Sequence, residues 1–179
     1  FIHHHLPSLE ELEILLKDIE PNFISVHFAP EYPGKDPAEL FRNLIYYTRK
    51  RGLDLSSIKG SMDFDPLLDW AEPPFQPLAR ILNFAARHTP QFRVLQVNGR
   101  QLHTGIDNTS RELALIVAKG VEYLAQLNDL GIDPKTTNNH LQFSMALSTS
   151  YFVEIAKLRA LKILWANALA GFGLEQAAI

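Results

Sequence analysis

Two histidines, His27 and His103, are the side chains in this sequence best suited to acid–base chemistry. An imidazole gains and loses a proton near neutral pH, so it can act as a general acid or a general base. Each histidine lies in or just after a run of residues with strand character. A hydrogen-bonded histidine that lines a sheet is the more common finding in such a place, and catalysis is the alternative.

Other polar side chains gather where predicted strands end. Asp63 and Asp65 could form a carboxylate pair, although the sequence DFDP also suits a turn before Pro66. Lys59 lies in a predicted strand and could bind an anion or form a Schiff base. The remaining candidates at strand ends are Glu31, Gln101 and the residues at 148–150.

Several kinds of site are excluded or unsupported. His3, His4 and His5 could bind a transition metal, but an expression remnant or a solvated loop is the better interpretation, so we predict no metal site. The chain has no cysteine, which excludes disulfides, thiolate nucleophiles and cysteine-ligated metal centres. It also lacks the glycine-rich phosphate-binding motifs and the G-x-S-x-G motif.

Length and composition indicate one globular domain. The 179 residues are 46% hydrophobic and 21% charged, with a net charge of -3 at pH 7. Such a chain can bury one core, and its charge favours neither nucleic acid nor a membrane surface as partner. No apolar run approaches the roughly 20 residues of a membrane-spanning helix. A chain without cysteine is compatible with a reducing cytoplasm, and we predict a cytoplasmic protein. Because the chain begins with Phe1, we interpret it as a piece of a longer protein.

Strands and helices are predicted to alternate after a leading helix at about residues 8–20. Ser8 and Glu11 have the spacing of a capping box for that helix. Strands are predicted at 23–28, 57–64, 92–102 and 141–147. Helices are predicted at 38–51, 78–88, 110–130 and 151–170, the third with a capping box at Thr109 and Glu112. The pattern predicts a single α/β domain with four βα units over about residues 23–170.

The predicted strands alternate between apolar and polar residues. In the first, Ile24, Val26 and Phe28 alternate with Ser25 and His27. Helices on one face and polar side chains on the other favour a TIM-type (β/α) barrel with a polar lumen, although barrel interiors are usually apolar. Four units make half of a barrel. We therefore predict a half-barrel whose open sheet edges are covered by a second copy or another chain.

Three stretches of the sequence are more specific than its periodicity. They are NGRQLHTG at 98–105, RELALIVAKGVEYLAQLNDLGID at 111–133 and LQFSMALSTSYFVEIAKLRALKILWA at 141–166. Together they resemble the acyl-CoA-binding barrel of the adenosylcobalamin-dependent methylmalonyl-CoA mutase family. The resemblance implies a lumen that binds an acyl-CoA. The substrate-binding candidates that would line it are His27, Gln96, Asn98, Gln101, His103, Gln142, Ser144 and Ser148.

At several positions the sequence differs from the catalytic members of the family that it resembles. Gln101 occupies the position of the family's acid histidine, and a glutamine amide cannot transfer a proton at pH 7. The segment KGSMDFDPLLDW at 59–70 lacks the family's substrate-contacting glutamine and arginine, and the cobalt-ligating D-x-H-x-x-G motif is absent. Val94, Gln96 and Asn98 stand where small lumen residues are expected, which would narrow the channel.

These departures imply a small, non-catalytic subunit, a pseudoenzyme that stabilises a heterodimer. Its catalytic large subunit would be the isomerase that interconverts methylmalonyl-CoA and succinyl-CoA, with adenosylcobalamin bound in the complex but not by this chain. Two alternatives stay open. The parent protein could be an active acyl-CoA mutase that uses His103 as its acid, or an acyl-CoA-binding module without chemistry.

Overall fold

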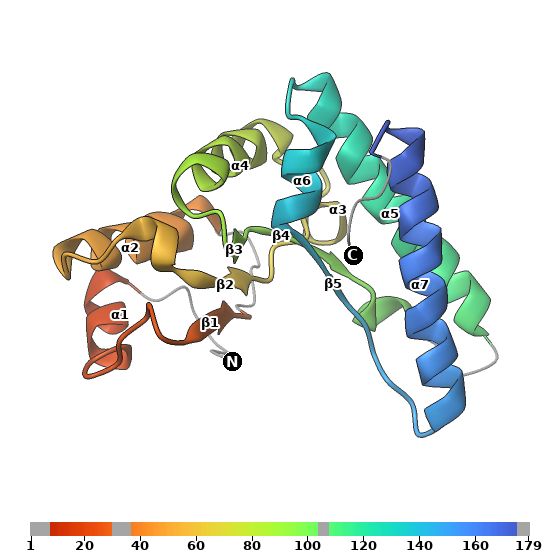
Figure 1. The fold of residues 1–179 in the computed structure, drawn as a ribbon, viewed down its shortest axis with the longest axis horizontal. Coiled ribbons are helices and arrows are strands. Elements are labelled where there is room, and N and C mark those ends of the chain that lie inside the picture. Colours follow the sequence, from red (N-terminus) through yellow and green to blue (C-terminus); the bar gives the residue numbers. More distant parts are fainter. Residues whose placement is uncertain (1–7, 30–36, 104–107, 175–179) are drawn as a thin grey trace. The chain divides into compact units, whose positions relative to one another are not determined.

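The structure, a computed structural model, describes residues 8–29, 37–103 and 108–174 (Figure 1). Its elements in chain order are α1 Leu9–Leu15, β1 Ser25–Phe28, α2 Pro37–Lys50, η1 Leu55–Ser57, β2 Lys59–Met62, α3 Pro66–Asp69, α4 Phe75–His88, β3 Phe92–Arg93, β4 Leu95–Asn98, η2 Arg100–Leu102, α5 Thr109–Asp129, α6 Pro134–His140, β5 Leu141–Ser144 and α7 Tyr151–Gly171. The chain divides into two compact units. The first comprises Phe1–Gln96 and Asn139–Leu141, and the second comprises Val97–Asn138 and Gln142–Ile179.

The first unit contains a parallel sheet with the strand order β1–β2–β3. Val26 of β1 lies opposite Gly60 of β2. Gly60 has a φ of +139°, and a Cβ atom there would lie 1.8 Å from the carbonyl oxygen of Val26. Glycine is therefore required for β1 and β2 to pair in this register.

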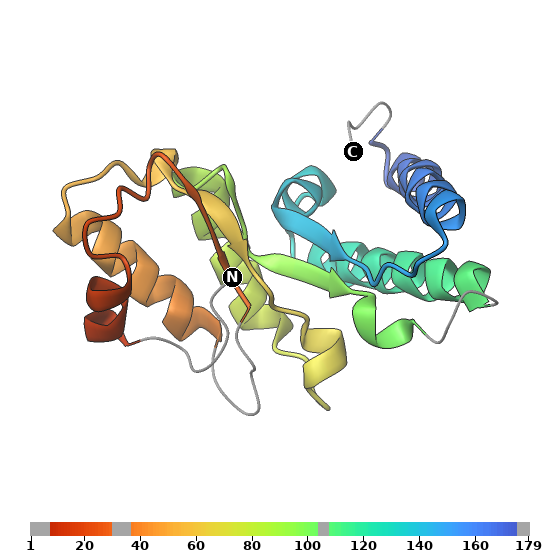
Figure 2. The same cartoon turned by 90° about the horizontal axis from the view of Figure 1, so that it is seen from below.

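Helices α2 and α4 lie on the same side of this sheet and supply its apolar core (Figures 1 and 2). Buried apolar side chains of this core include Val26, Phe28, Leu40, Leu44, Met62, Leu78 and Leu82. Helix α1 packs against α2. Its predicted capping box is confirmed, because the Ser8 hydroxyl accepts from the Glu11 N–H at 3.2 Å and the Ser8 N–H donates to the Glu11 carboxylate at 2.7 Å.

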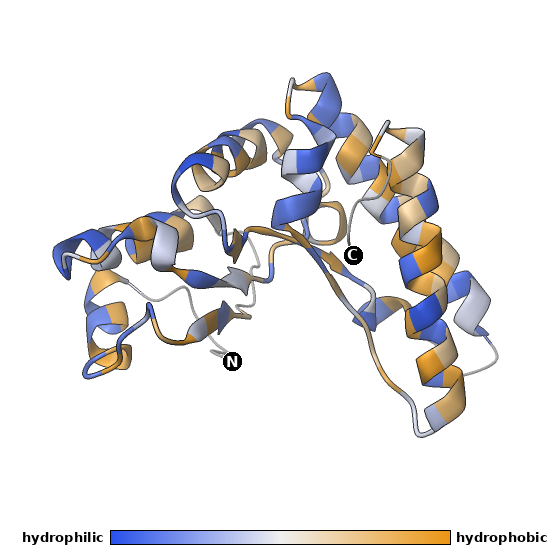
Figure 3. Cartoon of the chain, in the orientation of Figure 1, coloured by the Kyte–Doolittle hydropathy of each residue, from blue (hydrophilic) through white to orange (hydrophobic). Residues whose placement is uncertain are grey.

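Helices α5 and α7 pack against each other in the second unit. A Cβ atom at Gly120 of α5 would lie 2.6 Å from Cζ3 of Trp165, so glycine lets the two helices approach closely. The Trp165 ring also packs edge-on against Phe143, with ring centroids 4.9 Å apart, and its Nε1 donates to Asn138 at 2.9 Å. Helix α7 carries hydrophobic residues along most of its length (Figure 3).

The third predicted strand, at 92–102, is wrong as one continuous strand. The structure has the short strands β3 and β4 there, followed by the 3-10 helix η2. Asn98 ends β4, because its Oδ1 accepts a hydrogen bond from the backbone N–H of Arg100 at 3.0 Å. Strand β5 ends at Ser144 and does not extend to Leu147.

Two short helices, α3 and α6, have no counterpart among the predicted elements. Each begins with a proline that follows an aspartate, Pro66 after Asp65 and Pro134 after Asp133. Proline suits the first turn of a helix, because the N–H that it lacks would have no intrahelical partner there. The Asp-Pro pairs were the available signal for both helices.

The α/β class predicted from the sequence is confirmed. Short parallel strands alternate with helices, as in a partial βα barrel, and the sheets of the described residues do not form a closed barrel. Among the described residues, no helix has both the length and the apolar character needed to cross a bilayer.

Candidate functional site

His27, Ser61 and Arg93 lie in one row across the three parallel strands of the first unit. The register pairs His27 with Ser61 and Ser61 with Arg93, so the three side chains share one face of the sheet. His27 Nδ1 lies 2.8 Å from the Ser61 hydroxyl. The buried Val26 and Phe28 alternate with this row and face the core. The row is the polar face that alternation in the sequence assigned to the lumen.

A cavity of about 360 Å³ opens on this polar face. Its lining includes Ser25, His27, Lys59, Gln91, Arg93 and Asn139. Ser25 and Lys59 are the first residues of β1 and β2, so the cavity lies toward the amino ends of the strands. Barrel enzymes place their chemistry at the opposite, carboxyl ends. With Lys59 and Arg93 in its wall, the cavity suits an anionic group better than it suits acid–base chemistry.

A second polar cluster, which we call the buried ion cluster, comprises His103, Glu112, Glu154 and Lys157 of the second unit. Lys157 Nζ lies 2.7 Å from a Glu154 carboxylate oxygen and 3.4 Å from Oε1 of Glu112. It also donates to the carbonyl of Ala146 at 2.7 Å. Oε2 of Glu112 lies 2.9 Å from Nδ1 of His103. The Glu112 and Lys157 side chains have no exposed surface, so these partners replace water around buried charges.

The start of two helices brings these groups together. Glu154 and Lys157 lie one turn apart on α7, on the same stripe as the buried Leu161 and Trp165. A charged pair at i and i+3 within an otherwise apolar stripe is therefore the sequence signal for this part of the cluster. Glu112 lies in the first turn of α5.

The predicted capping box at Thr109 and Glu112 is wrong. Helix α5 begins at Thr109, and its N-cap residue is Asn108. The Glu112 side chain is buried and contacts His103 and Lys157. Glu112 has the spacing of a capping-box residue, but its carboxylate belongs to the buried ion cluster.

The buried ion cluster changes the acidity of Glu154. The hydrogen bond with Lys157 and the interactions with Ser148 lower the pKa of the Glu154 carboxyl from 4.5 to about 2, against the effect of burial. The backbone N–H of Ser148 donates to Oε1 of Glu154 at 3.0 Å. Through Ala146 and Ser148, the cluster fixes the segment after β5 to the first turns of α7.

The structure divides the predicted substrate-binding residues between the two units. His27 and Gln96 belong to the first unit, and the second contains Asn98, Gln101, His103, Gln142, Ser144 and Ser148. Gln96 is buried, with its backbone N–H donating to the carbonyl of Phe64 at 2.8 Å. Gln101 is exposed on η2, whereas His103 is joined to the buried ion cluster.

The β4 and β5 candidates are partly buried. Gln142 and Ser144 are half-buried, and the carbonyl of Ser144 accepts from the Gly99 N–H at 2.7 Å. Asn98 is also half-buried, and its carbonyl accepts from Lys119 Nζ at 3.2 Å. These backbone contacts fix the two strands and leave the roles of their side chains as predictions.

The remaining candidates lie in turns, strand starts or outside the described residues. Asp65 is the buried N-cap residue of α3, and the N–H of Asp63 donates to the carbonyl of Phe28 at 2.8 Å, as suits the turn interpretation of DFDP. Lys59 is exposed at the start of β2. Glu31 and the residues at 3–5 lie outside the described residues.

Within residues 8–29, 37–103 and 108–174, no three histidine, aspartate or glutamate side chains are placed to hold a metal ion together. His140 has a structural contact, since its Nδ1 donates to the carbonyl of Phe92 at 2.7 Å. Burial lowers the pKa of His140 below its ordinary value.

Known proteins with similar sequences share one description. Residues 5–178 match the family model named Methylmalonyl-CoA mutase. The methylmalonyl-CoA mutase small subunit of Porphyromonas gingivalis is 31% identical over 171 residues, which are 93% of this chain and 27% of that protein. The large subunit from the same organism is 26% identical over 180 residues, 94% of this chain and 24% of the relative. The small subunit of Streptomyces virginiae is 30% identical over 139 residues, 75% of this chain and 23% of the relative.

These matches extend over most of the chain but over only part of each relative. The chain spans about a quarter of the length of the three relatives. The family model covers nearly all of its residues. The chain belongs to the methylmalonyl-CoA mutase family.

Proposed function

We propose that the chain is part of the small, non-catalytic subunit of an adenosylcobalamin-dependent methylmalonyl-CoA mutase. The observation that carries this proposal is the side chain at position 101, where the family resemblance expects an acid histidine. Gln101 is an exposed amide on η2, and an amide does not exchange a proton with substrate at pH 7. The subunit stabilises a heterodimer whose large subunit interconverts methylmalonyl-CoA and succinyl-CoA.

The partner in this proposal is the catalytic large subunit. Porphyromonas gingivalis has relatives named as the small subunit and the large subunit of methylmalonyl-CoA mutase, and this chain is similar to both. Its identity is 31% to the small subunit and 26% to the large one, which supports the small-subunit role. We place the complex in the cytoplasm.

Adenosylcobalamin is bound by other parts of the complex in this proposal. The histidine that ligates its cobalt in the family belongs to a D-x-H-x-x-G motif, and this sequence contains no such motif. Neither His103 nor His140 lies in that sequence context. No histidine of this sequence stands in the D-x-H-x-x-G motif.

The test uses the full-length protein that contains this chain, mixed with the large subunit of the same organism. We expect a heterodimer that turns over methylmalonyl-CoA when adenosylcobalamin is present, and no turnover by the small chain alone. Gln101→His in the small chain should leave the turnover of the complex unchanged, because the large subunit supplies the acid. A small chain that neither binds nor supports the large chain would overturn the proposal.

A second function is favoured by the contact between His103 and Glu112. A buried carboxylate that accepts the Nδ1–H of a histidine fixes its tautomer and leaves Nε2 able to exchange a proton. On this alternative, the full-length protein is itself an acyl-CoA mutase with His103 as its acid. The protein with adenosylcobalamin and no partner should then show turnover that His103→Ala abolishes. The absence of turnover would exclude this alternative.

Acyl-CoA binding without chemistry is supported by the cavity that contains Lys59 and Arg93. Two cations in the wall of this cavity suit the phosphates of coenzyme A. Calorimetry of the full-length protein with coenzyme A should then show binding that Arg93→Ala weakens and that Arg87→Ala, at an exposed position of α4, leaves unchanged. No heat of binding would indicate a closed lumen.

A further inference from the structure

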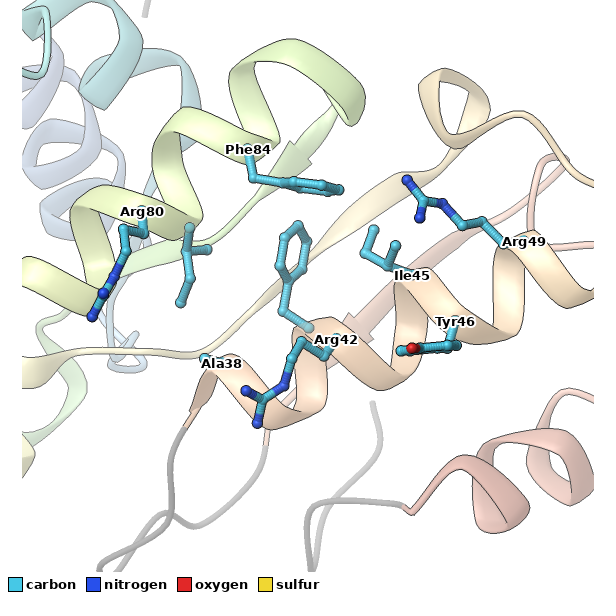
Figure 4. A pocket seen from close by; sticks show the side chains of 9 residues that line it. Ala38, Arg42, Ile45, Tyr46, Arg49, Arg80 and Phe84 are labelled. Carbon is cyan, nitrogen blue, oxygen red and sulfur yellow. The ribbon is translucent and has the colours of Figure 1, made fainter.

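A groove between α2 and α4 combines an apolar floor with a basic rim. Phe41, Ile45 and Ile81 are almost fully buried and form its floor, and Arg42, Arg49 and Arg80 stand around it. We call this site the arginine groove. Phe84 packs edge-on against Phe41 beside the floor, with ring centroids 5.9 Å apart. In the close view, Arg80 from α4 and Arg49 from α2 lie toward opposite ends of the groove, with Phe84 between them (Figure 4).

The charge of the rim has one sign. Three of the described lining residues are arginines, and none of the described lining residues is an aspartate or a glutamate. A guanidinium group binds a carboxylate through two parallel hydrogen bonds, and arginine is favoured over lysine where such planar recognition is needed. The groove is therefore complementary to an apolar group flanked by carboxylates.

The α2 side of the groove presents a regular stripe of large side chains. Arg42, Tyr46 and Arg49 follow one another at helical spacing on one face of the helix. Tyr46 is 67% exposed, although its aromatic ring offers a large apolar area. Tyrosine and arginine are the residues in which the binding energy of protein interfaces is often concentrated.

The arginine groove is small. Its volume is about 280 Å³. Pockets that enclose drug-sized ligands and cofactors span roughly 300–1,000 Å³ and bury most of the ligand. The arginine groove lies at the lower end of that range, and side chains of α2 and α4 bound it. It suits one large side chain that projects from a polypeptide.

We propose that the arginine groove binds an acidic, amphipathic segment of a partner protein. One aromatic or aliphatic side chain of that segment enters between Phe41, Ile45 and Ile81. Carboxylates on either side of it pair with Arg49 and Arg80. The proposal does not depend on the role of this chain in a mutase, because it rests on α2 and α4 and not on the position of Gln101.

The probe is a fluorescent peptide with the sequence SLEELEILLKDIE, which corresponds to residues 8–20 of this chain and has the required chemistry. It combines five acidic residues with one lysine, and its Ile14 is 75% exposed in the protein. We expect its fluorescence anisotropy to rise on titration with the full-length protein. Replacing the glutamates by glutamine, or Ile14 by alanine, should weaken binding at least about tenfold.

Variants of the protein locate the binding surface. Arg49→Glu with Arg80→Glu should weaken peptide binding at least about tenfold, because repulsion replaces two charge-assisted contacts. Arg87→Glu makes the same charge change at an exposed position of α4 that does not line the groove, and it should leave binding unchanged. Circular dichroism checks that all variants are folded.

Two results would overturn the proposal. One is the absence of peptide binding, or binding that Arg49→Glu with Arg80→Glu and Arg87→Glu weaken equally. The other is a concentration-dependent dimer of the protein, detected by sedimentation velocity, that Arg49→Glu with Arg80→Glu dissociates. In that case a second copy occupies the groove. Neither result depends on whether the full-length protein binds a mutase large subunit.

Discussion

Lys157 and Glu112 form an ion pair in which both side chains are fully buried, with Nζ 3.4 Å from Oε1. The two residues are 45 positions apart in the chain, so the pair joins the start of α7 to the first turn of α5. Removing charges from water costs several kcal/mol per ion, which is offset only when each charge keeps close partners. Glu154 and the carbonyl of Ala146 supply further partners for the ammonium group.

Replacing Lys157 tests the energetic role of the buried ion cluster. Lys157→Met keeps a long side chain but leaves the carboxylates of Glu112 and Glu154 without their cation. We expect the free energy of unfolding of the second unit to fall by about 3–5 kcal/mol. Urea unfolding followed by the fluorescence of the buried Trp165 measures this, in a Trp70→Phe background that removes the other tryptophan.

A matched control separates the buried charge from a general effect on α7. Lys162 is exposed on the same helix, and Lys162→Met should change the free energy of unfolding by less than about 0.5 kcal/mol. Adding Glu112→Gln to Lys157→Met should recover part of the loss, because one uncompensated charge is then removed. Equal effects of Lys157→Met and Lys162→Met would contradict this account of the cluster.

The low pKa of Glu154 predicts a specific acid sensitivity. The carboxyl has a pKa of about 2 in the folded protein, against an ordinary value of 4.5, so the unfolded chain binds more protons between these values. Its contribution to stability is complete above about pH 4.5 and is lost as the pH falls toward 2. Glu154→Gln keeps an acceptor for the Ser148 N–H but cannot ionise, so it should remove this part of the pH dependence.

Urea unfolding at several pH values across this window measures the slope of stability against pH. Glu122→Gln is the control, since Glu122 is exposed on α5 and should leave the slope unchanged. If the slope of the Glu154→Gln variant equals that of the unsubstituted chain, another carboxyl causes the acid sensitivity.

The elements that the sequence predicted well are those set by local pattern. The leading helix has its capping residues within three positions of each other, and the apolar residues of α2, α4 and α5 recur at helical spacing. The interruption between β3 and β4 has a different origin. Val94 lies there, and its N–H donates to the carbonyl of His140, far along the chain, at 3.0 Å. A local pattern contains no information about such a partner.

The candidate site shows the same division between local and distant information. The chemistry of imidazole was enough to single out His103, but its partner Glu112 matched the local spacing of a capping box. Its inclusion in the buried ion cluster depends on Lys157, which a different helix supplies. Arg93 was not among the predicted site residues, because its position beside Ser61 and the cavity arises only when the three strands pair.

Gly60 allows a test of the pairing between β1 and β2. A Cβ atom there would lie 1.8 Å from the carbonyl oxygen of Val26, and the φ of +139° is one that other residues rarely adopt. Gly60→Ala should therefore prevent the sheet of the first unit from forming, with loss of its circular dichroism and cooperative unfolding. Gly52 also has a positive φ, but a Cβ atom there would meet no atom within 4 Å. Gly52→Ala should therefore lower the free energy of unfolding by only about 1 kcal/mol. Similar losses of stability in both variants would show that the positive φ, and not the contact with Val26, makes Gly60→Ala destabilising.

His140 should make the first unit less stable in mild acid. Burial lowers its pKa below the ordinary 6.5, an effect that the charge of Arg93 reinforces and that outweighs the hydrogen bond to Phe92. The unfolded chain therefore binds more protons just below pH 6.5, so the contribution of His140 to stability is present above that pH and is lost as the pH falls through the folded pKa.

The pKa of His140 can be measured directly from the pH dependence of its ring proton resonances, assigned by their loss in His140→Gln. That variant keeps a donor for the carbonyl of Phe92 but takes up no proton, so the slope of stability against pH below neutrality should decrease. His88→Gln, at an exposed position at the end of α4, should leave the slope unchanged. A folded pKa at or above the ordinary value would mean that the hydrogen bond to Phe92 outweighs burial, and stability would then not fall in mild acid on account of His140.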